Sequence, residues 1–268
     1  MRHLAVLLRS IPGGFLVSSL GIALWSAALA FIPAPWSILP MIPVLWLFWK
    51  FFAGRLGPGL GAQYRKEQFR LTRLPARTWI WGLGGALLFV VIVQASFVLT
   101  FRILPFPDAA FTGEYTVLDR VPVWVAWALL VMGSIVAGVS EEIGFRGYMQ
   151  RPLEKQYGPV VAIGVTSLIF MLIHLNHSWA RPIWPQIVFA SILLGILAWR
   201  TQSLIPGIIG HSILDIFDYS VWWSHLTGGF RQLPVSRTGV DLAFVSWVFI
   251  FVAALAGFGI AVGKLKRD

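Results

Sequence analysis

The sequence contains no cysteine and very little charge. Only 12% of its 268 residues are charged, whereas 57% are hydrophobic; soluble domains have about 25% charged residues. The absence of cysteine excludes disulfides, thiolate metal sites and thiol nucleophiles, so any chemistry must come from histidine, carboxylate, hydroxyl or backbone groups. The scarcity of charge and a mean hydropathy of +0.78 exclude a soluble or disordered chain. They predict an all-α, polytopic membrane helix bundle.

Eight apolar segments are candidates for transmembrane helices. Each approaches the roughly 20 residues that a helix needs to cross a bilayer. Most of the tryptophans flank a segment end, as is typical of membrane interfaces. The second and sixth segments are the shortest. The segments are 14–32, 36–53, 79–101, 123–149, 159–175, 186–199, 204–222 and 241–262.

The net charge of +10 reflects membrane topology rather than a nucleic-acid partner. If the N-terminus is cytoplasmic, all but five of the 21 Lys and Arg residues fall on inner segments, which is the bias that orients membrane proteins. We therefore expect both termini in the cytoplasm and no binding to nucleic acid. The five exceptions are Arg102, Arg120, Arg181, Arg231 and Arg237.

A basic inner loop, 54–78, separates the second and third spans. It carries Arg65, Lys66, Arg70 and Arg73 among apolar side chains, a composition typical of an amphipathic helix that lies on anionic lipid. A solvated connector would have the same composition. The sequence leaves both alternatives open.

Ionisable residues inside the spans are concentrated in the fourth to the seventh. Each costs about 2.5 to 3.5 kcal/mol at the bilayer centre, so it must be paired, protonated or in contact with water. Glu142 and Arg146 are at positions i and i+4 of one helical face, in the order that favours an ion pair. Glu141 points roughly 100° away from Glu142. One carboxylate is therefore expected to be structural and the other to be available for chemistry.

Helix geometry predicts which polar groups can meet. Glu141 and His174 are nearly equidistant from the polar stretch 150–158, at about 24 Å of helix rise each. If that stretch is a turn in the cytoplasm, the pair lies about 12 Å inside the membrane, and His211 lies about 14 Å from the turn 201–203. We therefore expect the carboxylate and both imidazoles at one depth.

The seventh span adds a second carboxylate to this level. His211 and Asp215 are at i and i+4, with Asp218 one turn further. A glutamate base, two histidines and an aspartate in a partly dry site suit the activation of water and the stabilisation of an oxyanion, or the binding of a metal. Alone, each motif is typical of a salt-bridged helix end or of a packing histidine. In this order and at one depth, they indicate a hydrolase.

These motifs resemble a known signature. The order Glu141-Glu142-x-x-x-Arg146, Phe170-x-x-x-His174 and His211-x-x-x-Asp215 resembles that of the CAAX protease and bacteriocin-processing (CPBP, or Abi) family of intramembrane endopeptidases, over about residues 123–222. The resemblance implies an eight-helix bundle with a site open to the cytoplasmic leaflet. On this basis we expect N-terminal transmembrane helices in 1–121, the catalytic core in 122–223, and an outer loop with the last helix in 224–268.

The resemblance also implies a role for each motif residue. Glu141 and His174 would activate the hydrolytic water, and His211 and the residue four positions later would support the oxyanion. The site would be supported by Glu142, Arg146 and Phe170.

Asp215 departs from the Ras-converting branch of the family, which usually has Asn at this position. An ionised aspartate cannot donate a hydrogen bond to an oxyanion, so Asp215 would have to be protonated, orient His211 or bind a metal. Glu141, His174, His211 and Asp215 together could chelate zinc or another divalent metal, but four protein ligands would close the site. The family has been described both as metallo-type and as glutamate-type, and the latter needs no metal.

The expected partners follow from the resemblance. The substrate would be a peptide or a membrane protein, with or without an attached lipid, and the protein would lie among membrane lipids, most simply in a bacterial inner membrane. The first alternative is a non-catalytic binding protein of the immunity type with the same fold. The second is a transporter, which would show broken helices in two related halves, and the sequence has no such pair.

Overall fold

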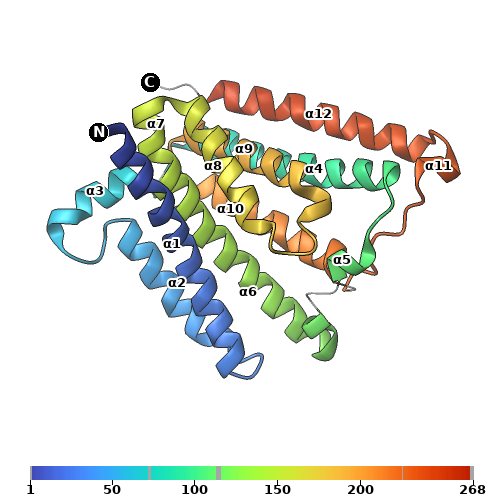
Figure 1. Cartoon of the computed structure of the whole chain (residues 1–268), viewed down its shortest axis with the longest axis horizontal. Helices are drawn as coiled ribbons and strands as arrows, with labels where there is room; N and C mark the ends of the chain where they lie inside the picture. Colours follow the sequence, from blue (N-terminus) through green and yellow to red (C-terminus); the bar gives the residue numbers. More distant parts are fainter. Residues whose placement is uncertain (1, 72–73, 113–115, 225, 266–268) are drawn as a thin grey trace.

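The computed structural model describes residues 2–71, 74–112, 116–224 and 226–265, and within these ranges the chain is helical without a β-strand. Helices form at all eight predicted segments (Figure 1). They are α1 (Arg2–Phe31), α2 (Ile38–Phe52), α4 (Ala76–Ile103), α6 (Val123–Glu141) continuing into the π-helical η2 (Glu142–Gln150), α8 (Pro159–His174), α9 (Trp184–Thr201), α10 (Ile205–Phe217) continuing into the π-helical η4 (Asp218–Trp222), and α12 (Leu242–Lys264).

Shorter helices connect these elements. Within the described residues, five apolar helices are long enough to cross a membrane: 6–31, 76–103, 123–157, 181–201 and 242–264. The sixth predicted span is thus longer than the sequence indicated, whereas α2 and α8 are the shorter apolar helices. The connecting helices are α3 (Gly59–Phe69), α5 (Asp108–Thr112), η1 (Thr116–Arg120), α7 (Arg151–Tyr157), η3 (Arg181–Ile183) and α11 (Val235–Thr238).

The helices form one bundle with α10 near its centre. α10 packs between α6 and α4, while α1 covers α6 and η2, and α8 packs against α9. On the other side, α4 lies along α12. α1 begins and α12 ends at the same end of the bundle (Figure 1). We call this end, which also carries α3 and α7, the inner end.

Two glycines let the helix that carries the paired glutamates approach its neighbours. A Cβ at Gly138 would lie 2.3 Å from the Ser212 hydroxyl of α10, and a Cβ at Gly144 would lie 2.6 Å from the Gly14 carbonyl oxygen of α1. Both distances are shorter than van der Waals contact allows. Gly138 therefore permits α6 to pack closely against α10 just before the two glutamates, and Gly144 permits η2 to pack closely against α1 just after them.

The stretch 150–158 is not the cytoplasmic turn that the sequence predicted. It continues the helix as α7, and the chain reverses at Gly158, whose φ of +81° is in the left-handed region that favours glycine. The helix continues because two of the polar side chains, Gln150 and Glu154, are buried in a protein network. The predicted depth of the site was counted from a turn that projects into the cytoplasm. Because this turn is absent, the depth cannot be counted in that way.

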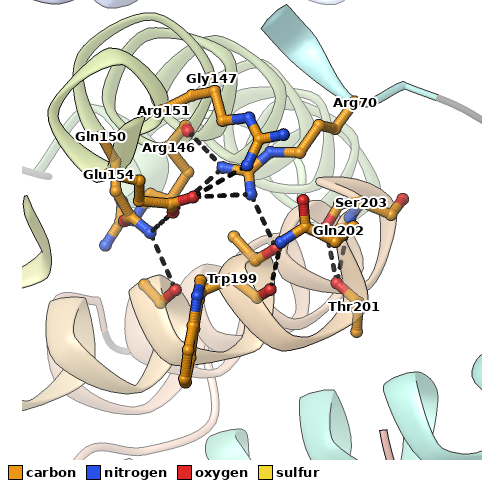
Figure 2. Close-up of polar contacts among 12 residues, drawn as sticks. Arg70, Arg146, Gly147, Gln150, Arg151, Glu154, Trp199, Thr201, Gln202 and Ser203 are labelled. Atoms are coloured by element: carbon orange, nitrogen blue, oxygen red, sulfur yellow. Dashed lines mark hydrogen bonds and ion pairs between the residues drawn. The ribbon is translucent and has the colours of Figure 1, made fainter. Parts of the chain in front are cut away.

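That network, which we call the inner cluster, consists of Arg70, Gln150, Arg151 and Glu154 (Figure 2). The Glu154 carboxylate accepts hydrogen bonds from Arg70 at 3.3 and 3.4 Å, from Gln150 at 2.7 Å and from Arg151 at 3.2 Å. Arg70 also donates to the Arg146 carbonyl oxygen at 3.1 Å and to the Ala198 carbonyl oxygen at 3.2 Å. The inner cluster thus joins the end of α3 to η2, α7 and α9.

The basic inner loop forms a helix, but two of its arginines do not face lipid. Arg65 donates to the carbonyl oxygens of Phe51 at 2.9 Å and Leu56 at 2.7 Å, and Arg70 belongs to the inner cluster. Only Lys66 of the basic residues named for this loop is exposed. Arg73 lies outside the described residues.

Candidate functional site

The two adjacent glutamates stand where α6 widens into the π-helical turns of η2. Glu142 and Arg146 form the expected ion pair, with 2.9 Å between Glu142 Oε1 and Arg146 Nη1, and both side chains are fully buried. Arg146 Nη2 also donates to the hydroxyl of Ser191 on α9 at 2.8 Å and to its carbonyl oxygen at 3.2 Å. A buried ion pair needs such additional hydrogen bonds to offset its desolvation. The pair therefore fixes η2 against α9.

Glu142 has a second partner that the sequence did not indicate. His211 on α10 places its Nδ1 2.9 Å from the same Glu142 Oε1. Because a carboxylate paired with arginine can only accept, we infer that His211 Nδ1 carries the hydrogen of this bond. Arg146 and Glu142 on η2 and His211 on α10 therefore form a buried chain that sets the orientation of the imidazole ring. Ser191 joins this chain to α9 through Arg146.

The other nitrogen of His211 faces the remaining carboxylates. Its Nε2 is 3.7 Å from Glu141 Oε2 and 3.7 Å from Asp215 Oδ1. The Glu141 and Asp215 side chains are 14% and 17% exposed, in contrast to the fully buried Glu142. Because Nδ1 already carries the hydrogen bonded to Glu142, a second proton on Nε2 makes His211 an imidazolium, whose Nε2–H is a hydrogen-bond donor. This arrangement can hold a proton and present it to a reacting oxygen.

His174 enters the site from α8 with its ring orientation also set. Its Nδ1 is 2.7 Å from the carbonyl oxygen of Phe170, which can only accept, so the ring hydrogen is on Nδ1. In neutral His174, Nε2 is then an acceptor. The Phe170 ring centroid lies 4.5 Å from that of His174 and 4.9 Å from the Arg146 guanidinium carbon. Phe170 thus packs between the imidazole and the buried ion pair.

A cavity of about 90 Å³ lies beside these groups, which is room for a few water molecules. Its polar lining includes His174, His211, Asp215 and Asp218, and its apolar lining includes Phe170, Trp179 and Trp223. The site therefore combines ionisable groups, some space for water and an aromatic wall.

One polar group in this lining was not assigned a role from the sequence. Asp218 is buried, and its Oδ1 accepts a hydrogen bond from Gln94 Nε2 at 2.6 Å, while Gln94 Oε1 accepts one from Trp222 Nε1 at 2.8 Å. In the sequence, Gln94 is a polar side chain within the apolar span 79–101. Because a polar side chain in a membrane span needs a hydrogen-bond partner, its position could have indicated a partner on another helix.

The structure does not join all the predicted site residues directly. Glu141 is in contact with His211, but the described residues show no direct hydrogen bond or ion pair between Glu141 and His174. Nor do three or more His, Asp or Glu residues within the described ranges gather closely enough to hold a metal ion. The alternative in which Glu141, His174, His211 and Asp215 bind a divalent metal stays a prediction.

Comparison with known proteins finds a match over the segment that contains most of the candidate site. The family Type II CAAX prenyl endopeptidase Rce1-like matches residues 122–217. The UPF0177 protein YbdI of Lactococcus lactis subsp. lactis (strain IL1403) is 29% identical over 118 residues, which are 43% of this chain and 59% of that relative. The alignment thus covers less than two thirds of the relative's length. No solved structure matches the chain significantly.

Proposed function

The protein belongs to the CAAX protease and bacteriocin-processing (CPBP, or Abi) family, and we propose that it is an intramembrane endopeptidase in which Glu141 and His174 activate water. The observation that carries the proposal is the position of His211. Glu142, which is paired with Arg146, bonds one ring nitrogen, and the other nitrogen faces Glu141 and Asp215. His211, Asp215 and His174 all line the cavity.

In the proposed reaction, a water molecule lies between Glu141 and His174, which have no direct contact in the structure. Its oxygen attacks the carbonyl carbon of the peptide bond, and one of its protons passes to the Glu141 carboxylate. The acceptor Nε2 of His174 orients the water through its other hydrogen. The substrate carbonyl becomes a tetrahedral oxyanion.

The oxyanion is proposed to be stabilised from the α10 side. His211 Nε2–H donates to it, and Asp215 donates when its carboxyl group is protonated. Collapse of the tetrahedral intermediate breaks the C–N bond, and Glu141 returns its proton to the leaving nitrogen. Peptide and water thus yield one carboxylic acid and one amine, with Glu141 regenerated.

The proposed substrate is a peptide or a membrane protein that reaches the site within the bilayer. The aromatic wall of the cavity, formed by Phe170, Trp179 and Trp223, suits an apolar segment or an attached lipid better than a charged one. C-terminally lipidated peptides therefore belong in the first set of substrates to be tested.

The test is mass spectrometry of a diverse peptide pool, including C-terminally lipidated peptides, after incubation with the purified protein. The Glu141→Gln variant should lose the cleavage products, and the matched variant Asp119→Asn, which changes an exposed carboxylate in η1, should keep them. Identical product sets from the unmodified protein and folded Glu141→Gln would contradict the proposal and favour the non-catalytic binding protein. Activity that survives strong chelation would support the glutamate-type mechanism.

A further inference from the structure

A second pocket, separate from the catalytic cavity, opens at the inner end of the bundle. It has a volume of about 330 Å³ and lies between α3, α7 and the end of α9. We call it the basic pocket. It shares no lining residue with the catalytic cavity. Its lining includes Gln63, Lys66, Arg70, Arg151, Lys155 and Gln202.

The charge of the basic pocket is unbalanced. Glu67 is the acidic residue of its lining, and it accepts a hydrogen bond from Gln63 on its own helix. The buried Glu154 carboxylate, which does not line the pocket, forms ion pairs with Arg70 and Arg151. Lys66 and Lys155 are exposed, and neither forms an ion pair with a carboxylate in the described part of the chain. The lining of the pocket therefore has four cationic side chains against the one carboxylate of Glu67, which is an excess of positive charge.

The position of the pocket points to the membrane surface. The inner end is the cytoplasmic end by the distribution of basic residues, and headgroup phosphates lie at that level. α8 begins shortly after Lys155, and its Val160 and Val161 are 84% and 50% exposed, as side chains in contact with acyl chains would be. A lipid could thus place its headgroup in the pocket and its tails along α8.

We propose that the basic pocket binds a phosphate-bearing anion and that the headgroup of an anionic lipid is its source. Lysine ammonium groups bind phosphate as point charges, and arginine adds directed N–H donors. The ligand would also affect the catalytic helix. Arg70 contacts both the pocket and the carbonyl oxygen of Arg146, whose guanidinium holds Glu142.

The test measures binding and needs no peptide substrate. The full-length protein in neutral detergent is titrated with short-chain phosphatidylglycerol, short-chain phosphatidylcholine or inorganic phosphate, and its thermal unfolding midpoint is recorded. Phosphatidylglycerol should raise the midpoint in a salt-sensitive manner, and phosphatidylcholine should not. In the Lys66→Gln/Lys155→Gln double variant, phosphatidylglycerol should bind at least about tenfold more weakly.

The matched control is Arg55→Gln/Arg77→Gln, which removes the same charge from two exposed inner arginines outside the pocket. This variant should bind phosphatidylglycerol like the unmodified protein. Inorganic phosphate could raise the midpoint as much as phosphatidylglycerol does, with the effect lost only in the lysine variant. This result would confirm a phosphate site and show that its ligand is the free ion. Equal weakening in both double variants, or a response only to a peptide with a free C-terminal carboxylate, would overturn the proposal.

Discussion

Two groups of carboxylates lie on or against the continuous helix formed by α6, η2 and α7. In the inner cluster, Glu154 accepts four hydrogen bonds from Arg70, Gln150 and Arg151. At the candidate site, the described residues give Glu141 and Asp215 one close ionisable partner, His211 Nε2, at 3.7 Å from each. Asp215 lines the cavity, whereas Glu141 is not among its lining residues. The hydrogen-bonding capacity of Glu154 is thus used within the protein, whereas Glu141 and Asp215 can still accept from water or substrate.

Glu142 is adjacent to Glu141 in the sequence, but it resembles Glu154 in being buried and paired with an arginine. Its Oε1 is shared by Arg146 and His211, and its side chain is fully buried. The number of partners and the exposure of the side chain, rather than the residue type or the position in the motif, therefore distinguish a structural carboxylate from a chemical one.

The largest expected effect is that of Arg146→Ala. This change leaves Glu142 buried without its cation and removes the anchor of His211, so it should destabilise the protein by about 3 to 5 kcal/mol and abolish cleavage. Folded yield and the thermal unfolding midpoint in detergent measure the first effect, and the peptide assay measures the second. Arg77→Ala, at an exposed arginine in the first turn of α4, is the control, and equal stability of the two variants would contradict the assigned role.

The second prediction isolates Glu141. Glu141→Gln keeps the shape of the side chain but removes the proposed base, so the cleavage rate should fall by about 10² to 10⁴. The unfolding midpoint should stay close to that of the unmodified protein, because Glu141 accepts no hydrogen bond within the described residues. A large loss of stability would place Glu141 with the structural carboxylates instead.

The same substitution in the inner cluster should lower the stability and leave the cleavage rate nearly unchanged. Glu154→Gln removes the charge that Arg70 and Arg151 share, so it should lower the stability by about 1 to 3 kcal/mol. Below the unfolding temperature, the cleavage rate per folded molecule should change little. The comparison between the two regions fails if Glu154→Gln and Glu141→Gln produce the same pattern of stability and rate.

Asp215→Asn should have a smaller effect on the rate. Asparagine always has an N–H donor, whereas aspartate donates only when protonated. The variant should therefore retain cleavage within about tenfold of the unmodified protein. Its rate should also depend less on pH at the acidic end of the profile. Complete loss of cleavage would show that the carboxylate itself is required, for example to orient His211.

The smallest effect on stability is expected at the ion pair between the end of α4 and the start of α12, where Arg102 Nη2 is 2.7 Å from Asp241 Oδ2. This hydrogen bond, together with the one from the Phe244 backbone N–H, holds the pKa of the Asp241 carboxyl below its ordinary value. The contribution to stability should therefore be present at neutral pH and lost as the pH falls through the lowered pKa, below 3.8. The midpoint difference between the unmodified protein and Asp241→Asn, followed from neutral pH to about pH 3, should decrease accordingly.

Much of the architecture could be read from the sequence. Apolar length set the eight helical segments, because an unpaired backbone cannot lie in lipid. The 3.6-residue period placed Glu142 and Arg146 on one face and separated Glu141 from both. The resemblance of the motifs in 123–222 indicated the family to which the chain belongs. These features depend on local spacing, which the sequence contains.

The partners of the polar residues were decided by tertiary structure. Glu142 meets His211 across 69 positions of sequence, Arg70 meets Glu154 across 84, and Gln94 meets Asp218 across 124. The π-helical turns of η2 and the burial of Gln150 and Glu154 likewise depend on neighbouring helices. Helical periodicity determines which side chains share a face. Which faces meet, and at what height, depends on close packing between helices, as at Gly138 and Gly144, and this packing involves residues distant in sequence.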